Sequence, residues 1–336
     1  MDKGQQLSLY PLLFAPAHKD YIWGGRNLAR LLNRDLPAGR IAESWEIAAH
    51  EDGVAVAING PYAGLPLTTI HKRLGLDLVG TNNTWAQDRG KFPLLVKLLD
   101  AQDKLSIQVH PDDCYALSHE GNELGKTEMW VVLHAVPEAT IIMGVRSGTT
   151  REVFREAINN GTLEQYLHTL QVKAGDVVCV PSGTVHAIMG GVVIAEIQQN
   201  SNTTYRVYDW NRTQDGKPRL LHIDKALDVI NFAAVEPQLV TPSLISDEDG
   251  VRRSLLCRNQ YFTTERVEFE DAAEFSGWLN GESFEIWGVI DGQIEVNDVH
   301  LEAIQFTLLP AALGAYRIKV QGSTSCLRTY VEKSPA

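Results

Sequence analysis

The sequence predicts a mainly β protein that consists of two β-barrels with a small helical insertion. Polar and apolar residues alternate with a period of two in residues 104–113 and 125–133, as on strands that have one polar face. Residues 175–188 predict a strand, a tight turn and the start of the next strand. From about residue 252 the chain is almost wholly of the same alternating type. Residues 144–172 change to a helical period, which predicts an insertion between the strands of the first barrel.

The other elements of the first half follow from local periodicity and turn residues. Trp23-Gly24-Gly25 predicts a turn, because these glycines lack the strand-to-helix context of a phosphate-binding loop. Alternation predicts strands in residues 42–60, and an apolar run predicts a strand at 92–101. Short helices are expected at 27–32, 65–74, 111–120 and 223–232.

The domain boundaries are predicted from a change in composition. Residues 234–249 contain Pro237, Pro242 and an S-D-E-D-G turn, as in a linker. We therefore expect a metal-binding catalytic domain in residues 1–235, with the helical insertion at about 144–172. A second β-domain is expected in residues 250–336.

Composition and charge limit the possible partners. The chain has 336 residues, of which 44% are hydrophobic, an ordinary value for a globular protein. Its formal net charge is -12, with 42 acidic against 30 basic residues. The electrostatic field of a protein with this negative charge would not attract nucleic acid or an anionic membrane. We therefore expect a small-molecule ligand. An anionic ligand would need a local basic pocket.

The expected location is the cytoplasm. Cys114, Cys179, Cys257 and Cys326 are widely spaced without a C-x-x-C pair, which fits reduced thiols better than a disulfide scaffold. The first residues lack the pattern of a signal peptide, and no apolar run is long enough to span a membrane.

Four polar side chains are predicted to meet inside the first barrel. Gln108 and His110 share a strand face with Ser106, Glu128 begins a strand that is otherwise apolar, and His186 ends a G-x5-P-x-G-x2-H turn. An isolated inward histidine is usually a hydrogen-bonded core residue. Three such segments together would leave a buried carboxylate without a counter-ion, so a metal is the better interpretation.

The donor types indicate which metal this would be. Two imidazoles, a carboxylate and an amide oxygen suit zinc and would also accept other divalent first-row ions. We expect one Zn2+ per chain, held by Gln108, His110, Glu128 and His186. Ser106, on the same strand face, is expected to contact the substrate.

Further charged residues occupy positions that favour a function. Glu196 shares one strand face with Ile194 and Gln198, so its carboxylate points inward. Arg206 lies on the following strand, where it either contacts a ligand or forms a surface ion pair. Lys97 interrupts an apolar strand, and its side chain either extends along apolar surface to water or supplies a cation to the substrate.

A second set of polar residues allows two interpretations. Glu43, Trp45 and His50 lie on predicted strands and could border a site. An ordinary sheet face with a buried tryptophan is the simpler explanation.

The second β-domain repeats part of the first without its ligands. The segment I-Q-F-T-L-L-P-A-A-L-G-A-Y has Pro310 in the place of Pro181, and Ala315 stands where His186 stands. We therefore expect a packing or oligomerisation module without metal ligands. The chain is expected to be a monomer or a homodimer.

Several motifs resemble one family over nearly the whole chain. Q-V-H-P-D-D, G-K-T-E-M-W, P-S-G-T-x-H and N-S-N-T-T-Y-R-V-Y-D-W resemble the type I phosphomannose isomerases, particularly the shorter bacterial form. The resemblance implies cupin-type (jelly-roll) barrels and a zinc-dependent interconversion of mannose 6-phosphate and fructose 6-phosphate. It implies zinc at the four predicted ligands and active-site roles for Arg206, Glu196 and Lys126.

One departure from the wider cupin pattern narrows the possible chemistry. Many cupins have H-x-H followed closely by Glu, whereas here Gln108 replaces the first His and Glu128 follows His110 by eighteen residues. The resembling isomerases share this departure, which counts against a dioxygenase-type cupin.

The implied reaction moves a proton between C1 and C2 through an enediol. Glu196 is a candidate base, because burial raises a carboxyl pKa, although zinc or Arg206 would lower it again. Arg206 and Lys126 suit phosphate or enediolate oxygens. Two alternatives stay open: a non-catalytic sugar-phosphate-binding regulatory cupin, and a metal-dependent cupin isomerase or epimerase for another sugar.

Overall fold

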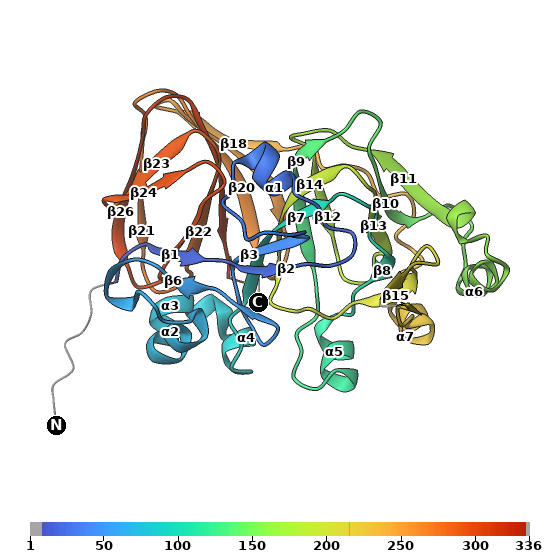
Figure 1. The fold of residues 1–336 in the computed structure, drawn as a ribbon. Coiled ribbons are helices and arrows are strands. Elements are labelled where there is room, and N and C mark those ends of the chain that lie inside the picture. Colours follow the sequence, from blue (N-terminus) through green and yellow to red (C-terminus); the bar gives the residue numbers. More distant parts are fainter. Residues whose placement is uncertain (1–8, 215, 334–336) are drawn as a thin grey trace. The chain divides into compact units, whose positions relative to one another are not determined.

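The computed structural model describes residues 9–214 and 216–333 and is mainly β, as predicted (Figure 1). The described chain forms two compact units. The site unit comprises residues 18–44 and 95–241, and the C-terminal unit comprises residues up to 17, 45–94 and from 242 onward. The domain boundaries expected from the sequence, 1–235 and 250–336, stay a prediction. The compact units have different boundaries from these domains, because residues 45–94 pack with the carboxy-terminal segment.

Two sheets make up most of the site unit. One has five strands in the order β11-β10-β13-β8-β15, and the other has six in the order β12-β9-β14-β7-β3-β2. Whether each pair of sheets closes into a barrel stays a prediction. The strands are β2 (Ala17–Lys19), β3 (Glu43–Ile47), β7 (Leu94–Ala101), β8 (Ile107–Val109), β9 (Glu128–Ala135), β10 (Thr140–Val145), β11 (Leu167–Gln171), β12 (Val177–Val180), β13 (His186–Ile188), β14 (Val192–Gln199) and β15 (Tyr205–Tyr208).

Alternation along β8 separates a core face from a site face. Ile107 and Val109 are fully buried in an apolar cluster that also contains Phe154 of α6 and Leu227 of α7. Gln108, between them, points to the opposite face, because successive side chains on a strand alternate. Its register partner is His186 of β13 on one side and Arg206 of β15 on the other. Three polar residues from distant segments therefore meet on one face.

Helices and short turns connect these strands. They are α1 (Asn27–Leu32), α5 (Asp113–His119), α6 (Arg151–Asn160), the 3-10 helix η3 (Leu163–Tyr166), α7 (Ile223–Val229) and the hairpin strands β16 (Thr213–Gln214) and β17 (Lys217–Pro218). Asp112 and Thr150 cap α5 and α6 by accepting hydrogen bonds from the backbone N–H groups of Tyr115 and Val153. No helix in the described ranges is long and apolar enough to cross a membrane.

The expected helical insertion is shorter than 144–172. Helix α6 ends at Asn160 with Gly161 in the left-handed region, and η3 ends at Tyr166. Residues Leu167–Gln171 are instead strand β11, because their backbone groups pair with β10. Alternate exposure along β11 fits this edge position.

The C-terminal unit contains an eight-stranded sheet, β18-β19-β20-β27-β22-β25-β1-β6, and a four-stranded sheet, β21-β26-β23-β24. The strands are β1 (Leu12–Ala15), β4 (Ala49–His50), β5 (Gly53–Val54), β6 (Val56–Ala57), β18 (Ser243–Glu248), β19 (Val251–Arg258), β20 (Thr263–Phe269), β21 (Glu274–Leu279), β22 (Glu285–Asp291), β23 (Gln293–Val296), β24 (Val299–Glu302), β25 (Phe306–Leu309), β26 (Gly314–Val320) and β27 (Thr324–Tyr330). Its helices are η1 (Gly60–Tyr62), α2 (Leu67–Leu74), α3 (Leu76–Val79), η2 (Thr81–Asn83) and α4 (Thr84–Gln87).

Two expectations about this unit have different outcomes. Pro310 lies in the turn between β25 and β26, as Pro181 lies between β12 and β13, so the predicted repeat of the strand-turn-strand pattern is confirmed. The predicted linker at 234–249 is wrong in its second half, which forms the edge strand β18. The acidic residues of β18 suit an edge that faces water.

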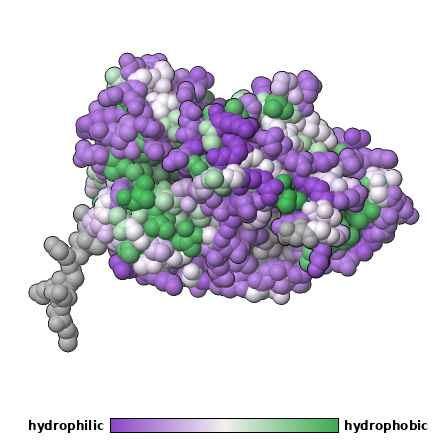
Figure 2. Space-filling view, viewed as in Figure 1, coloured by the Kyte–Doolittle hydropathy of each residue, from purple (hydrophilic) through white to green (hydrophobic). Residues whose placement is uncertain are grey.

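Hydrophilic residues cover most of the face in Figure 2, with hydrophobic residues in small groups between them.

The state of the cysteines differs from the expectation. Cys114 and Cys326 are free thiols, whereas Cys179 and Cys257 are disulfide-bonded, contrary to the expected reduced state.

An ion cluster around the buried Glu265 links four strands of the eight-stranded sheet, β19, β20, β27 and β22. Arg253 donates two hydrogen bonds to Glu265, of 2.9 and 2.8 Å, and Tyr330 donates a third of 2.7 Å. Arg328 lies 3.7 Å from Glu265 and donates to Glu285. Burial acts to raise the pKa of Glu265, but these hydrogen bonds outweigh it and hold the pKa below 4.5.

We predict that Glu265→Gln lowers the free energy of unfolding by about 3 kcal/mol near neutral pH, the low end for breaking a buried pair. Arg253, which is 25% exposed, loses the carboxylate that accepts its two hydrogen bonds, whereas Arg328 keeps Glu285. Since the folded pKa of Glu265 is depressed, its stabilisation is complete above the unfolded value of 4.5 and disappears as pH falls through the folded value. Denaturant unfolding from pH 7 to pH 3 measures this. The exposed Glu268→Gln on the same strand is the control. A constant difference between Glu265→Gln and the unmodified protein across this range would contradict the prediction.

Candidate metal centre and active site

Three side chains from three segments form a possible metal-binding group. His110 follows β8, Glu128 begins β9 and His186 begins β13. Their candidate ligand atoms all lie within 4.8 Å of one another, and each residue is at most 1% exposed. The sequence prediction that these residues meet is correct.

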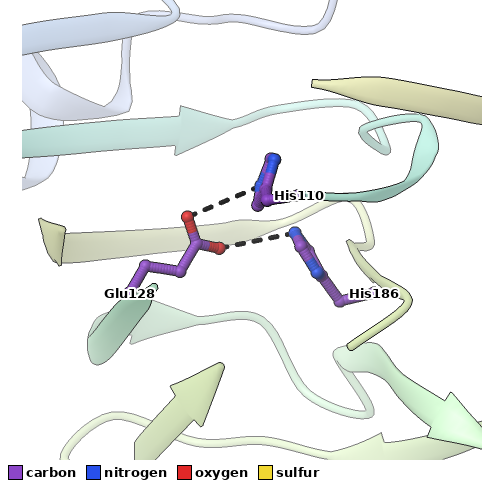
Figure 3. A group of neighbouring side chains, drawn as sticks. All are labelled: His110, Glu128 and His186. Atoms are coloured by element: carbon purple, nitrogen blue, oxygen red, sulfur yellow. Dashed lines mark ion pairs between the residues drawn. The ribbon is translucent and has the colours of Figure 1, made fainter. Parts of the chain in front are cut away.

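The carboxylate of Glu128 faces both imidazoles from one side, with one oxygen toward each ring (Figure 3). Its Oε1 is 3.4 Å from Nε2 of His186, and its Oε2 is 3.6 Å from Nε2 of His110. These separations are longer than a good hydrogen bond. They are close to the ~3.3 Å between two ligands of one tetrahedral ion with bonds of about 2.0–2.1 Å. The spacing therefore fits a shared ion.

Both histidines are held as neutral ligands. Nδ1 of His110 is 2.8 Å from the carbonyl oxygen of Thr203, and Nδ1 of His186 is 2.9 Å from that of Thr184. A carbonyl only accepts, so each Nδ1 carries the hydrogen and each Nε2 keeps its lone pair. Burial lowers the pKa of His110 well below 6.5 and that of His186 to about 4. Both imidazoles are therefore ready to bind a cation near neutral pH.

The charges around this group also favour a cation. Lys126 Nζ lies 2.7 Å from Glu128 Oε2, 3.1 Å from His110 Nε2 and 3.8 Å from Glu196 Oε1. Lys97 Nζ lies 3.5 Å from both Glu43 and Glu196. Three buried carboxylates thus meet two buried ammonium groups.

One carboxylate oxygen in this cluster is poorly satisfied. Glu196 Oε1 accepts no hydrogen bond from a described residue, and its ammonium neighbours Lys97 and Lys126 lie 3.5 and 3.8 Å away, whereas Glu128 Oε2 pairs with Lys126 Nζ at 2.7 Å. Burying a carboxylate oxygen without a donor is costly. The residues therefore fit a divalent cation on three grounds: donor type, spacing and unbalanced negative charge.

Gln108 fits the predicted ligand set less directly. Its amide nitrogen, Nε2, faces Nε2 of His186 at 3.4 Å, and its Oε1 accepts a hydrogen bond from Ser106 at 3.3 Å. Ligation through oxygen requires the amide group to turn over. The residue is in place, but its oxygen is not directed at the three-residue group.

A polar cavity of about 100 Å³ adjoins the metal-binding group. It is several times larger than one water needs, so it suits a small ligand. Seven of the nine predicted site residues line it: Lys97, Ser106, Gln108, Lys126, Glu128, Glu196 and Arg206. The other two, His110 and His186, contact Glu128. The fold thus brings all nine together.

Glu196 is the candidate acid–base group in this cavity. It lies on β14 and is 3% exposed. Burial and the charge of Glu128 raise its pKa, and Lys126 and Lys97 oppose them without cancelling the shift. A carboxyl group with a raised pKa exchanges protons more readily near neutrality.

Arg206 supplies a cation from β15, on the same cavity. Its Nε is buried and has no hydrogen-bond partner among the described residues. Burial and the nearby Arg219 lower its pKa from the ordinary value of an arginine, yet a guanidinium remains charged in proteins. The surface ion pair considered for Arg206 is therefore not what the structure shows.

Several lining residues were not predicted. Trp23 was interpreted only as part of a turn, and Asn202, Thr204 and Arg219 were not singled out. The signal for Asn202 and Thr204 was their place in the N-S-N-T-T-Y-R motif. Arg219 offered no signal, since only folding returns it to the cavity. Glu43 does line the cavity, whereas Trp45 is a fully buried core residue.

Comparison with known proteins places the chain in a family. Residues 12–125 match the family model "Phosphomannose isomerase type I, catalytic domain". The chain is 37% identical to a mannose-6-phosphate isomerase of Bacillus subtilis, covering 96% of this chain and 99% of that protein. It is 42% identical to the mannose-6-phosphate isomerase of Streptococcus mutans, covering 75% of this chain and 77% of that protein.

A solved structure agrees with these relatives. The crystal structure of mannose 6-phosphate isomerase from Bacillus subtilis superposes with a TM-score of 0.84 at 33% identity, covering 96% of this chain and 99% of that one. The chain therefore belongs to the type I phosphomannose isomerase (mannose-6-phosphate isomerase) family.

Proposed function

We propose that this protein interconverts mannose 6-phosphate and fructose 6-phosphate, moving a proton between C1 and C2 through an enediol. The observation that carries the proposal is one cavity lined by Glu196, whose pKa is raised, by Glu128 of the His–Glu–His group and by Arg206. Membership of the mannose-6-phosphate isomerase family supports the choice of substrate. We further propose a cytoplasmic monomer or homodimer.

The proposal includes one Zn2+ per chain, with His110, Glu128 and His186 as ligands and Gln108 as the fourth. Neutral imidazoles fixed at Nδ1 and a buried carboxylate support this choice. When bound, the ion would polarise substrate oxygens as a Lewis acid.

The protein's own residues would carry the proton transfer. Glu196 removes the proton from C2 of the aldose and returns it to C1, while a second proton passes from O2 to O1. Lys126 and Arg206 stabilise the negative charge that develops on the enediolate oxygens. Ser106 and Lys97 contact the substrate, and Lys97 also keeps Glu196 close to an ammonium group.

A coupled assay tests the function directly. Conversion of mannose 6-phosphate to fructose 6-phosphate should fall to background after chelation and return when zinc is added. A folded, zinc-loaded protein without this conversion would refute the proposal.

The first prediction from this site concerns the metal. A His110→Ala, His186→Ala double variant should lose its ion, because two of three buried ligands disappear. Elemental analysis should fall from about one ion per chain to near zero. The exposed His300→Ala is the matched control and should keep its metal. Full metal content in a folded double variant would place the ion elsewhere.

The second prediction concerns Glu196. Glu196→Gln keeps the size of the side chain but removes the base, so kcat should fall by roughly 10²–10⁴-fold. In D2O the variant should also fail to exchange the C2 hydrogen, which NMR of the recovered substrate measures. Normal exchange in a metal-loaded variant would exclude Glu196 as the base.

The third prediction concerns Arg206. Arg206→Ala should lower kcat on the order of a hundredfold while leaving metal content unchanged, since a guanidinium has no place among metal ligands. Arg206→Lys should restore only part of the rate, because it keeps the charge but loses the fork geometry. Steady-state kinetics and metal analysis on the same samples measure these effects. Near-normal turnover of the alanine variant at full zinc occupancy would show that Arg206 has a structural role and not a catalytic one.

A further inference from the structure

One carboxylate closes the base of a hairpin beside the cavity. Arg212 precedes β16 and Arg219 follows β17, the two strands that pair as Thr213↔Pro218 and Gln214↔Lys217. Asp209 accepts two hydrogen bonds from Arg219, of 2.7 and 2.8 Å, and one of 2.6 Å from Arg212. Both ends of the hairpin are therefore tied to a single side chain.

Asp209 is itself held firmly in place. It is 5% exposed. Burial acts to raise its pKa, but the hydrogen bonds from Arg219 and Arg212 outweigh it and hold the pKa below 3.8. Arg212 also donates to the backbone oxygen of Lys104, at 2.6 Å, just before β8. A charged, immobile carboxylate thus fixes both guanidinium groups.

The way Arg219 is held leaves part of it available. Its Nε and Nη2 are used by Asp209, whereas Nη1 makes no hydrogen bond to any residue in the described ranges. The side chain is 11% exposed and lines the cavity together with Arg206. Arg206 likewise has an unpaired Nε. Two arginines that line one cavity therefore each keep an N–H group without a hydrogen-bond partner among the described residues.

Local charge shows what these donors would bind. Arg206, Arg212 and Arg219 carry three positive charges around the one buried carboxylate of Asp209, and Asp103, at 3.3 Å from Arg212, is largely exposed. The two cavity arginines repel each other, and Arg219 lowers the pKa of Arg206. An anion between them would relieve this repulsion. Paired guanidinium groups match a phosphate in charge and fork geometry.

We propose that Asp209 is a positioning residue that holds Arg219 at the cavity wall, and that Arg219 selects sugars that carry a phosphate monoester, while Arg206 keeps its role at the enediolate. The inference rests on the proposed isomerase function and deepens it, because it assigns the discrimination between phosphorylated and unphosphorylated sugar to named residues. Arg206 comes from the strand itself, whereas Arg219 reaches the cavity only through the closed hairpin.

The test is the ratio of kcat/KM for mannose 6-phosphate to kcat/KM for mannose. Arg219→Gln should reduce this ratio roughly 10- to 100-fold, since a charge-assisted hydrogen bond to phosphate is lost. Asp209→Asn should raise KM for mannose 6-phosphate several-fold with little change in kcat, and Asp209→Glu should recover part of the loss. A merely structural role for Asp209 would not produce this separation of KM from kcat. Arg155→Gln, at an exposed ion pair of the same unit, is the matched control.

Inorganic phosphate provides a readout that does not depend on turnover. Phosphate should inhibit the unmodified protein competitively and raise its melting temperature. In Arg219→Gln, the phosphate concentration needed for the same inhibition and the same rise in melting temperature should be about tenfold higher or more. Circular dichroism and metal content establish that each variant is folded. If Arg219→Gln does not fold, the milder Asp209→Asn carries the same comparison.

The outcomes separate the two proposals. No conversion of mannose 6-phosphate by the unmodified, metal-loaded protein would refute the isomerase function. Normal conversion with an unchanged ratio and unchanged phosphate inhibition in a folded Arg219→Gln variant would refute only this inference.

Discussion

The site depends on one constraint: His110 and His186 must stay neutral although both are buried beside the carboxylate of Glu128. A protonated imidazole would form an ion pair with that carboxylate instead of binding a cation. Each histidine gives its Nδ1–H to a backbone carbonyl, so its outer nitrogen keeps a lone pair that points toward Glu128. If either hydrogen bond were missing, the imidazole could turn or protonate and pair with the carboxylate. The backbone around Thr184 and Thr203 therefore sets the chemistry of side chains that lie far apart in sequence.

The same constraint explains how the surrounding charges are arranged. Burial alone would drive Glu196 to protonate and Lys126 to lose its proton. The carboxylates nevertheless raise the pKa of Lys126, whereas Glu196 keeps a raised pKa despite its two lysine neighbours. Lys126 is thus held as a cation, and the carboxyl group of Glu196 can gain and lose a proton more readily near neutral pH. The polar faces of a few strands therefore supply both a cation site and an acid–base group.

Alternation predicted much of this arrangement, because it reports directly which face of a strand a residue occupies. Alternation placed Gln108, His110, Glu128 and Glu196 on inward strand faces and a turn motif indicated His186, and the fold brings these five residues to one region. Contacts made through turns and hairpins carry no such periodic signal, so Arg219 and the role of Asp209 were missed. Strand β11 was mistaken for helix for a related reason: pairing with β10 decides its conformation, and local sequence does not. The resemblance to a known family supplied the substrate, which no spacing of residues could give.

The most direct measurement of this account is the tautomeric state of the two histidines. Nitrogen-15 NMR of chelator-treated protein near pH 7, assigned with single His110→Gln and His186→Gln variants, reports which ring nitrogen carries the hydrogen. The account predicts neutral imidazoles with the hydrogen on Nδ1 in both residues. Hydrogen on Nε2, or a protonated ring at this pH in either residue, would contradict it.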